Sequence, residues 1–549
     1  MYPVQPSEVV EALGTHGFRY IGRTEDRWLR FQGILHLPAS AHPCELDVDP
    51  AFLNLPRIRL LDVPKQLRPV AAHLDNAGGI CYAARGTLAL DIFDPIGQTL
   101  ACLERAGAVL ERILICGADD DLEEEFYAYW GIWPCLIDVC GELLGKQDAL
   151  LVRHGELHIP VITENKKRTL RKLRAFGWDD IGEEVSVNRV QAYRVQTNVQ
   201  PRPSQGKWPP ATVGDLLTWQ GLLDRRCRRK IRQRILEADS NGAFVAVILI
   251  KAPVLTYGFF VMFLRHGAGA PLRKGKVRVA REQKVYKLPV VPLQVQHIDD
   301  RYIAERNNPG QCTVAGKRMA LVGCGAIGGY LADMLMKSGV GTGGGLLVLI
   351  DDDEFKPQNI GRHHLGFPGL FQNKARALAA ELRRSSPGLN VQGWPEKVEQ
   401  VNLEAFDLII DATGEEALGH WLAARHGSSC PVLSVWVDGP GIAVRALLHE
   451  PGRGACSRCL FDYERSGQYH ATRETWTAEL AGQGCESLYV PFPAHVSVQA
   501  ASLGAEIALS WANGDTERKL RTRVTDRRYT LATTDCSPEQ RPTCPACVS

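Results

Sequence analysis

The stretch KRMALVGCGAIGGYLADMLMKSGVG, residues 317–341, decides the fold of the C-terminal half of this chain. Its apolar run MALVG predicts a buried strand, and AIGGYLADMLMKSG has the apolar spacing of a helix that ends at Gly339. Between them, Gly323, Gly325 and Gly328 form a Gly-x-Gly-x-x-Gly turn. A strand, glycine turn and helix N-terminus offer free backbone N–H groups and a helix dipole to phosphate. The stretch therefore predicts an α/β domain that binds a nucleotide.

The next predicted strand, GLLVLIDDDEF, ends in an acid that narrows the choice of nucleotide site. Asp351 lies 23 residues after Gly328, where an acid that binds ribose hydroxyls is expected. NAD(P) enzymes and flavoproteins share this much. The chain then continues with three segments that a dehydrogenase does not need: IDDDEFKPQNIGRHHL, QNKARALAAEL and FDLIIDATG.

These segments resemble the E1-type activating enzymes of the ThiF/MoeB/ubiquitin-activating superfamily. That family carries a D-x-D pair, an Asn and an Arg spaced three apart, a Lys before a helix, and an Asp at a later strand end. The matching residues are Asp351, Asp353, Asn359, Arg362, Lys374 and Asp411. The resemblance implies a Rossmann-like adenylation domain that binds ATP and Mg²⁺.

The resemblance also implies a role for each residue type. Arg362 and Lys374 would neutralise and orient the triphosphate. Asp411 and Asp353 would hold Mg²⁺, which prefers carboxylate and phosphate oxygens, and Asp351 would take the ribose hydroxyls. Members of this family form homodimers in which an arginine from just before the domain often enters the neighbouring subunit's site. The segment DDRYIAERN offers Arg301 and Arg306 for this, and the choice between them stays open.

Two Cys-x-x-Cys pairs have the spacing of a structural zinc site. They are Cys456 with Cys459, in GACSRCLF, and Cys544 with Cys547, in PTCPACVS. Each pair can supply two thiolates to a tetrahedral Zn²⁺, and similar pairs occur in bacterial enzymes resembling ThiF and MoeB. A redox role is disfavoured because neither pair is expected to open a helix after a strand, as in thioredoxin.

A nucleophilic cysteine is expected between the two pairs. E1-type enzymes pass the activated carboxylate to a cysteine as a thioester. Cys485 follows a glycine-rich loop and precedes a long apolar helix, as the catalytic cysteine does in several bacterial members. Cys536 is a weaker candidate, and Cys430, at the start of a predicted strand, is expected in the core.

The N-terminal region contains a second candidate transfer cysteine. WLRFQGILHLPA and HPCELDVDPAFLNLPRIRLLDVP predict strands, followed by a GGIC loop and a helix over residues 94–114. This order resembles ubiquitin-conjugating (E2) enzymes, an α+β fold, and the resemblance implies that Cys81 is the transfer cysteine. His73 and Asn76 fall in the region of the family's His-Pro-Asn segment. Here HLDN replaces that segment, which leaves open whether Asn76 stabilises an oxyanion.

The middle region shows α/β alternation without a convincing active site. Similar E2–E1 fusions use such a region as a linker or an inactive adenylation-like domain. An acidic run, ADDDLEEEF (residues 118–126), marks its start, and the basic run DRRCRRKIRQR (residues 224–234) predicts the solvated face of a helix. Core packing is expected for the cysteines of this region: Cys116, Cys135, Cys140 and Cys227.

Composition and apolar patterning bear on the partners and the cellular compartment of the protein. The chain has 64 Lys and Arg against 62 Asp and Glu, a formal net charge of +2, so direct nucleic-acid binding is not expected. Its N-terminus lacks the pattern of a signal peptide, which predicts a cytoplasmic protein with reduced cysteines. The most apolar run, AFVAVILI at residues 243–250, is far shorter than the roughly 20 residues of a membrane helix, and with VLTYGFFVMFL it predicts two buried strands.

Together these features predict an E2–E1 fusion with an E2-like domain (residues 1–115), a middle region (116–295) and an adenylation domain (296–549). Such an enzyme adenylates the C-terminus of a ubiquitin-like protein or of a nucleotidyltransferase, forms thioesters on Cys485 and then Cys81, and conjugates the protein to an amine. The organisation resembles fusions from bacterial antiphage operons with cyclic-oligonucleotide signalling and from ubiquitin-like operons.

Three alternatives stay open. A sulfur-carrier adenylyltransferase of ThiF/MoeB type shares the ATP and zinc residues but needs no GGIC domain. An NAD(P)-dependent oxidoreductase with zinc shares the glycine turn. A non-enzymatic zinc scaffold shares only the cysteine pairs.

Overall fold

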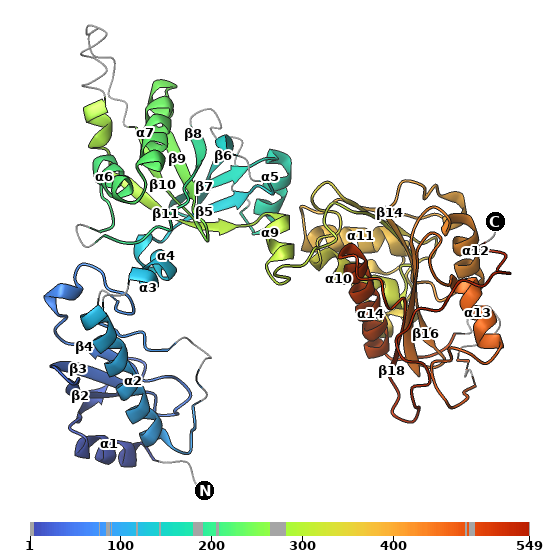
Figure 1. The fold of residues 1–549 in the computed structure, drawn as a ribbon, viewed down its shortest axis with the longest axis horizontal. Coiled ribbons are helices and arrows are strands. Elements are labelled where there is room, and N and C mark those ends of the chain that lie inside the picture. Colours follow the sequence, from blue (N-terminus) through green and yellow to red (C-terminus); the bar gives the residue numbers. More distant parts are fainter. Residues whose placement is uncertain are drawn as a thin grey trace.

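The computed structural model describes residues 5–75, 77–83, 88, 90–116, 119–141, 144–178, 190–204, 208–263, 282–477, 480–481 and 489–547. Its strands form three separate sheets: a four-stranded sheet, a closed barrel and a seven-stranded sheet. Figure 1 shows them as three bodies in chain order, with α3 and α4 between the first two and α9 between the last two. In the part of the chain that the structure describes, no helix combines the length and apolarity needed to cross a membrane.

The N-terminal body is an antiparallel sheet packed against one long helix. The sheet contains β1 (Arg19–Arg23), β2 (Leu29–His36), β3 (Ala41–Val48) and β4 (Arg57–Leu60), in that order. The helices are α1 (Pro6–Thr15), the short 3-10 turn η1 (Lys65–Leu67) and α2 (Pro95–Cys116). Apolar side chains along α2, among them Leu103 and Leu110, are buried in the same core as Phe31 of the sheet. This burial fixes the strands and the helix on either side of the GGIC loop.

The acidic run forms two short helices that join this body to the barrel. They are α3 (Asp119–Glu124) and α4 (Phe126–Trp130). Phe126 and Trp130 are fully buried in the barrel's core, where the Trp130 indole N–H donates to the Gly258 carbonyl at 2.8 Å. On the other side, Leu122 packs with Val70 of the N-terminal body. The acidic run is therefore a fixed connection between the two bodies.

The middle body is a closed, mixed seven-stranded barrel, in the order β10-β11-β5-β7-β6-β8-β9 with β9 paired to β10. Closure pairs both edges of every strand in the barrel. The α/β alternation of the middle region therefore does not produce an open parallel sheet with a nucleotide-binding crevice. The strands are β5 (Trp133–Asp138), β6 (Gly145–His154), β7 (Leu157–Thr163), β8 (Val190–Gln196), β9 (Val245–Lys251), β10 (Thr256–Met262) and β11 (Val290–His297). The helices are α5 (Lys166–Ala175), α6 (Val213–Leu223), α7 (Arg225–Ser240) and α9 (Asp300–Glu305).

Several smaller predictions for the middle region are confirmed. The two apolar runs form the paired strands β9 and β10. The basic run lies on α7, which buries Cys227 and Ile231 and exposes most of its charged side chains. Cys135 is buried as expected, whereas Cys140 is only half-buried, so core packing was wrong for that residue. The structure does not describe the side chain of Cys116.

The C-terminal body is a seven-stranded sheet with the order β14-β13-β12-β15-β16-β17-β18. The first five strands are parallel and the last two antiparallel. The strands are β12 (Arg318–Val322), β13 (Leu346–Ile350), β14 (Val391–Trp394), β15 (Leu408–Asp411), β16 (Val432–Asp438), β17 (Ala443–His449) and β18 (Leu520–Val524). The chain winds outward from β12 in both directions, so the carboxyl ends of β12 and β15 form the crevice where such sheets bind ligands.

Helices pack on this sheet and complete the domain. They are α10 (Ala326–Lys337), α11 (Lys374–Ser385), α12 (Glu416–His426), α13 (Ser457–Arg465) and α14 (Ala494–Ala512). Short 3-10 turns are η3 (Pro357–Arg362), η4 (Phe367–Gly369) and η5 (Val398–Gln400). The predicted Rossmann-like strand–turn–helix unit is confirmed as β12, the glycine turn and α10, and β13 ends just before Asp351.

Candidate active site

The glycine turn after β12 is shaped by close backbone contacts. Gly323 has φ +85°, and a Cβ on it would lie 2.8 Å from the Thr413 side chain. A Cβ on Gly328 would lie only 1.9 Å from the Gly323 carbonyl oxygen. Gly325 is the N-cap of α10. Only glycine fits at Gly323 and Gly328, and the turn aims the N-terminus of α10 at the crevice.

A cavity of about 1010 Å³ opens in front of this turn. Seven of the predicted nucleotide-site residues line it: Gly323, Gly325, Asp351, Asp353, Asn359, Arg362 and Lys374. They come from four separate segments, which the parallel sheet brings to one edge. Gly328 does not line the cavity but supports the turn from behind.

Asp351 is bound to the glycine turn. Its Oδ2 accepts a hydrogen bond from the Cys324 N–H at 2.7 Å, and its Oδ1 accepts one from the Asp353 N–H at 2.9 Å. Burial raises the pKa of Asp351, although the charge of Lys374 and these hydrogen bonds oppose that effect. The carboxylate therefore lies at the floor of the cavity, tied to the loop that would carry phosphate.

Two cations face the same cavity. The Lys374 ammonium lies 2.7 Å from Asp353 Oδ2 and is almost buried, at 12% exposure. The Arg362 guanidinium donates to the Val490 carbonyl at 3.0 Å and lies over the rings of Tyr489 and Phe492. Burial lowers the pKa of Arg362. No carboxylate bonds to Arg362 in the described residues, so its charge is available to an anionic ligand.

Asp411 lies at the wall between this cavity and a second one of about 400 Å³. The residue ends β15 and is 4% exposed. Its Oδ1 accepts hydrogen bonds from the Thr413 hydroxyl at 2.7 Å and the Thr413 N–H at 3.1 Å. Burial raises the pKa of Asp411 to about 6. The side chain lines the second cavity, while the residues that follow it line the first.

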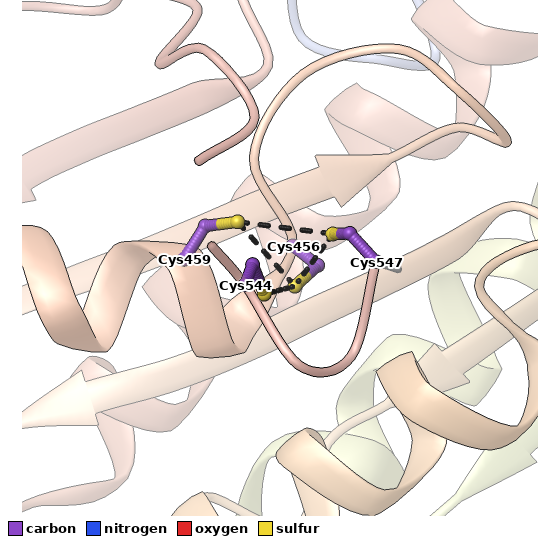
Figure 2. Close-up of side chains that lie close together, drawn as sticks. All are labelled: Cys456, Cys459, Cys544 and Cys547. Atoms are coloured by element: carbon purple, nitrogen blue, oxygen red, sulfur yellow. Dashed lines mark hydrogen bonds between the residues drawn. The ribbon is translucent and has the colours of Figure 1, made fainter. Parts of the chain in front are cut away.

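The four cysteines of the two pairs converge on one point, although 85 residues separate Cys459 from Cys544 (544 − 459 = 85). Figure 2 shows the four sulfur atoms facing one another, all within 4.8 Å. The hydrogen-bonded pairs are 3.4–3.8 Å apart. A tetrahedron with sulfurs about 2.3 Å from a central metal has edges of about 3.8 Å. The cluster could therefore hold Zn²⁺.

Local chemistry at this cluster also suits a metal. A hydrogen bond from the Cys456 thiol lowers the pKa of Cys459, and the Arg541 N–H donates to the Cys459 sulfur at 3.4 Å. The expectation that neither pair opens a helix was wrong, because Cys456 is the N-cap of α13. A helix N-terminus alone would leave a redox role open. The convergence of all four sulfurs favours metal binding.

Cys81 lies at the rim of a separate cavity of about 1270 Å³ in the N-terminal body. The Cys81 side chain is exposed, and the backbone N–H of Cys81 donates to the His73 carbonyl at 2.8 Å. Burial and the negative charge of Glu125 raise its pKa. Cys81 is thus accessible to a partner molecule.

The other candidate residues lie elsewhere. Cys485 and Asn76 fall outside the described residues. Arg301 and Arg306 lie on and just after α9, are exposed, and do not line the cavity of their own chain. Cys430 is buried in the core as expected, and Cys536 is half-buried.

Comparison with known proteins agrees with this arrangement. Residues 300–546 match the model of the ThiF family, and residues 28–132 match that of prokaryotic E2 family B. The chain is 49% identical over 99% of both lengths to "ATP-dependent ubiquitin transferase-like protein Cap2" of Pseudomonas aeruginosa. The chain belongs to the Cap2 family.

Other likenesses are more distant. The Cap2 protein of Escherichia coli is 26% identical, with 84% of this chain and 83% of the relative covered. The crystal structure of E. coli MccB with ATP aligns with 42% of this chain and 66% of its own at 16% identity and a TM-score of 0.31. Membership of the Cap2 family confirms the predicted E2–E1 fusion and its class, an ATP-dependent ubiquitin transferase-like enzyme.

One residue of this Cap2-family chain that sequence reasoning missed supports the glycine turn. His363, 5% exposed, donates from Nε2 to the Cys324 carbonyl at 2.6 Å, and its Nδ1 accepts from the Leu365 N–H at 2.9 Å. Only the neutral ring satisfies both partners, since a protonated Nδ1 would face another N–H. Burial lowers the pKa of His363 to about 4. The signal was the pair HH directly after Arg362, which the family pattern does not use.

This geometry predicts a pH-dependent loss of stability. His363 remains neutral in the fold down to pH about 4, whereas in the unfolded chain it takes up a proton near pH 6.5. The unfolded state binds more protons between these two pH values. The contribution of His363 to the free energy of unfolding is therefore fully present above pH 6.5. It is lost as the pH drops toward 4, by about 3 kcal/mol at most. Thermal unfolding of His363→Gln should lose this part of the pH dependence. His364→Gln, at the half-buried neighbour, should retain it; equal slopes for all three proteins would contradict the assignment.

Proposed function

We propose that this chain adenylates the C-terminal carboxylate of a ubiquitin-like protein or a nucleotidyltransferase and conjugates that protein to an amine. The observation that carries the proposal is the joining of two sites in one chain. The first is the cavity lined by Asp351, Arg362 and Lys374, and the second is the cavity at Cys81. An adenylating enzyme of sulfur-carrier type has use only for the first.

The adenylation step brings two anions together. The carboxylate oxygen attacks the α-phosphorus of ATP, the bond to the β-phosphate breaks, and pyrophosphate leaves. Arg362 and Lys374 lie where they can orient the triphosphate and offset the charge that develops on its oxygens. The N–H groups at the start of α10 would bind phosphate, and Asp351 the ribose hydroxyls. Asp411 and Asp353 would hold Mg²⁺, which neutralises phosphate oxygens when bound.

Two thioesters follow in the proposed sequence. The Cys485 sulfur attacks the acyl carbon, a C–S bond forms, and AMP leaves. The acyl group then moves to the sulfur of Cys81, and Cys485 regains a proton. Finally, an amine nitrogen attacks the thioester at Cys81, the C–S bond breaks and an amide forms. The exposed position of Cys81 supports this last step because both a donor and an acceptor must reach it.

The quaternary and biological parts of the proposal rest on resemblance. We infer a homodimer through the adenylation domain in which Arg301 or Arg306 enters the partner's ATP site. We infer a cytoplasmic role in antiphage defence. The functional units would be residues 1–115, 116–295 and 296–549, with the middle region as linker.

A structural zinc would tie the chain end to the core. Cys544→Ser should reduce bound zinc, measured by plasma emission spectrometry, from one atom per chain to near none. It should also lower the melting temperature, because a metal bound only by the folded state stabilises that state. Cys312→Ser, at an exposed cysteine outside the cluster, is the control. Full zinc content in Cys544→Ser would show that the cluster is not the site.

ATP–pyrophosphate exchange tests the proposed adenylation directly. Candidate substrates are proteins whose genes neighbour that of this chain, each compared with a version that lacks its C-terminal residue. We expect exchange with one intact candidate and none with its shortened form. NAD(P) binding in place of exchange would favour the oxidoreductase.

Exchange without any conjugation would favour the sulfur-carrier enzyme. Unaltered binding and function in Asp411→Ala and Arg362→Ala would favour the zinc scaffold.

A further inference from the structure

The acidic run at the start of the middle region reaches the Cys81 site. Glu125 lies between α3 and α4 and lines the same cavity as Cys81. Its side chain does not cap α4. Instead, both of its carboxylate oxygens accept hydrogen bonds from the loop that precedes Cys81 or from a side chain that bonds to that loop. The acidic run thus does more than separate two domains.

Glu125 holds both the backbone and the ring of His73. Its Oε2 accepts from the His73 N–H at 3.0 Å, and its Oε1 lies 2.8 Å from His73 Nδ1. The other ring nitrogen, Nε2, lies 3.1 Å from Asp121 Oδ2. A third donor, the Tyr129 hydroxyl, reaches Glu125 Oε2 at 3.1 Å and the Ala71 carbonyl at 3.0 Å. Asp121 and Glu125 of the acidic run, and Tyr129 of α4, therefore all bond to the loop that precedes Cys81.

His73 in turn holds Cys81. The residue has φ +59°, an uncommon conformation for a side chain other than glycine, and its carbonyl accepts the Cys81 N–H at 2.8 Å. A residue in this conformation persists when its surroundings fix it, and here the contacts of Glu125 do so. The path from Glu125 through His73 to Cys81 consists of two hydrogen-bonded steps.

The barrel fixes Glu125 itself. Directly after Glu125 come Phe126 and then Trp130, both without exposed surface and both packed among Trp219 and Tyr257 of the barrel's core. The carboxylate is therefore anchored to a body outside the N-terminal sheet.

We propose that Glu125 is a positioning residue that holds His73, and through it the Cys81 loop, in the geometry from which the Cys81 thioester is discharged to an amine. The segment of α3 and α4, between the N-terminal sheet and the barrel, then completes the transfer site. This inference rests on the proposed role of Cys81. It goes beyond that role because it assigns a part in the site to Glu125, a residue after α2 that is anchored through α4.

Glutamine at this position separates positioning from charge. A glutamine amide can accept from the His73 N–H and Tyr129 hydroxyl through its oxygen and donate to His73 Nδ1 through its nitrogen. Glu125→Gln therefore preserves the three contacts and removes the charge, whereas Glu125→Ala removes both. Glu124→Ala is the matched control, because Glu124 is exposed and does not line the cavity.

The test uses the full chain and loads Cys81 chemically, so that it does not depend on ATP or on Cys485. A short synthetic peptide ending in glycine is supplied as an alkyl thioester. The Cys81 sulfur attacks its acyl carbon, the old C–S bond breaks, and the alkyl thiol leaves with the proton from Cys81. Mass spectrometry of the Cys81 peptide follows the acyl group. Free lysine is then added. Its amine nitrogen bonds to the acyl carbon, the C–S bond breaks with the electron pair on sulfur, and the amine loses a proton as the sulfur gains one.

We expect Glu125→Ala to slow discharge at least about tenfold, since small displacements of reacting groups cost up to about 100-fold in rate. Glu125→Gln should remain within a factor of about three of wild type, and Glu124→Ala should match it. Wild-type discharge by Glu125→Ala would overturn the proposal. Equal slowing in Glu125→Gln and Glu125→Ala would also overturn it, because the charge would then be what matters. Failure of ATP and a protein substrate to load Cys81 in wild type would instead refute the proposed function.

Discussion

Replacing Cys81 with alanine is expected to abolish conjugation to amines while ATP–pyrophosphate exchange continues at the wild-type rate. Alanine cannot form a thioester, and Cys81 lies in a body separate from the nucleotide cavity. Amide products are measured by denaturing electrophoresis after reduction. Since Cys81 is exposed, the substitution should leave the melting temperature unchanged.

The control for this variant is Cys312→Ala, at another exposed cysteine. It should conjugate as wild type does. Unchanged conjugation by Cys81→Ala would contradict the E2 assignment. Loss of exchange in Cys81→Ala would indicate that the two sites do not act independently.

Asp411→Asn should reduce ATP–pyrophosphate exchange at least about 100-fold, a typical result of removing one electrostatic contact that stabilises a transition state. Asparagine has the same shape but lacks the charge expected to hold Mg²⁺. The same change should not lower the melting temperature. The folded-state pKa of about 6 lies above the ordinary value of 3.8, so ionising this buried carboxyl at pH 7 costs about 3 kcal/mol.

The sign of that cost follows from proton binding. Below pH 3.8 Asp411 is protonated in both states and the penalty is absent, and it grows as the pH rises through about 6. A residue that destabilises the fold at neutral pH is expected to serve function. Asp407→Asn is the control, because Asp407 is exposed near the other end of β15 and lines neither cavity. Wild-type exchange by Asp411→Asn would refute the role.

Much of the candidate nucleotide site is predictable because its signals are local. A strand ending just before Asp351, a glycine turn and a helix starting at Lys374 each follow from residue types within a few positions of one another. Parallel strands then bring their carboxyl ends to one edge without further information. The two cysteine pairs predict a metal site for the same reason, because the Cys-x-x-Cys spacing within each pair is a local pattern that suits metal binding.

The remaining features depend on contacts between distant segments. Closure of the barrel requires β5 to pair in parallel with β11, two strands at opposite ends of the middle body's sequence, and no single segment encodes this pairing. Glu125 meets His73 across 52 residues, and the acidic run gave no sign of this. His363 supports the glycine turn across 39 residues. Cys456 opens α13 within the four-cysteine cluster, which brings together the two distant cysteine pairs.

The central claim is that one chain activates a carboxylate with ATP and carries it on Cys81. The most direct measurement is the intact mass of the full chain after incubation with ATP, Mg²⁺ and the protein substrate that supports exchange, without reductant. We expect a covalent adduct that hydroxylamine removes. The adduct should map to Cys81, and both Cys81→Ala and Cys485→Ala should lose it from that position. Full exchange with no labile adduct on Cys81 would contradict the account.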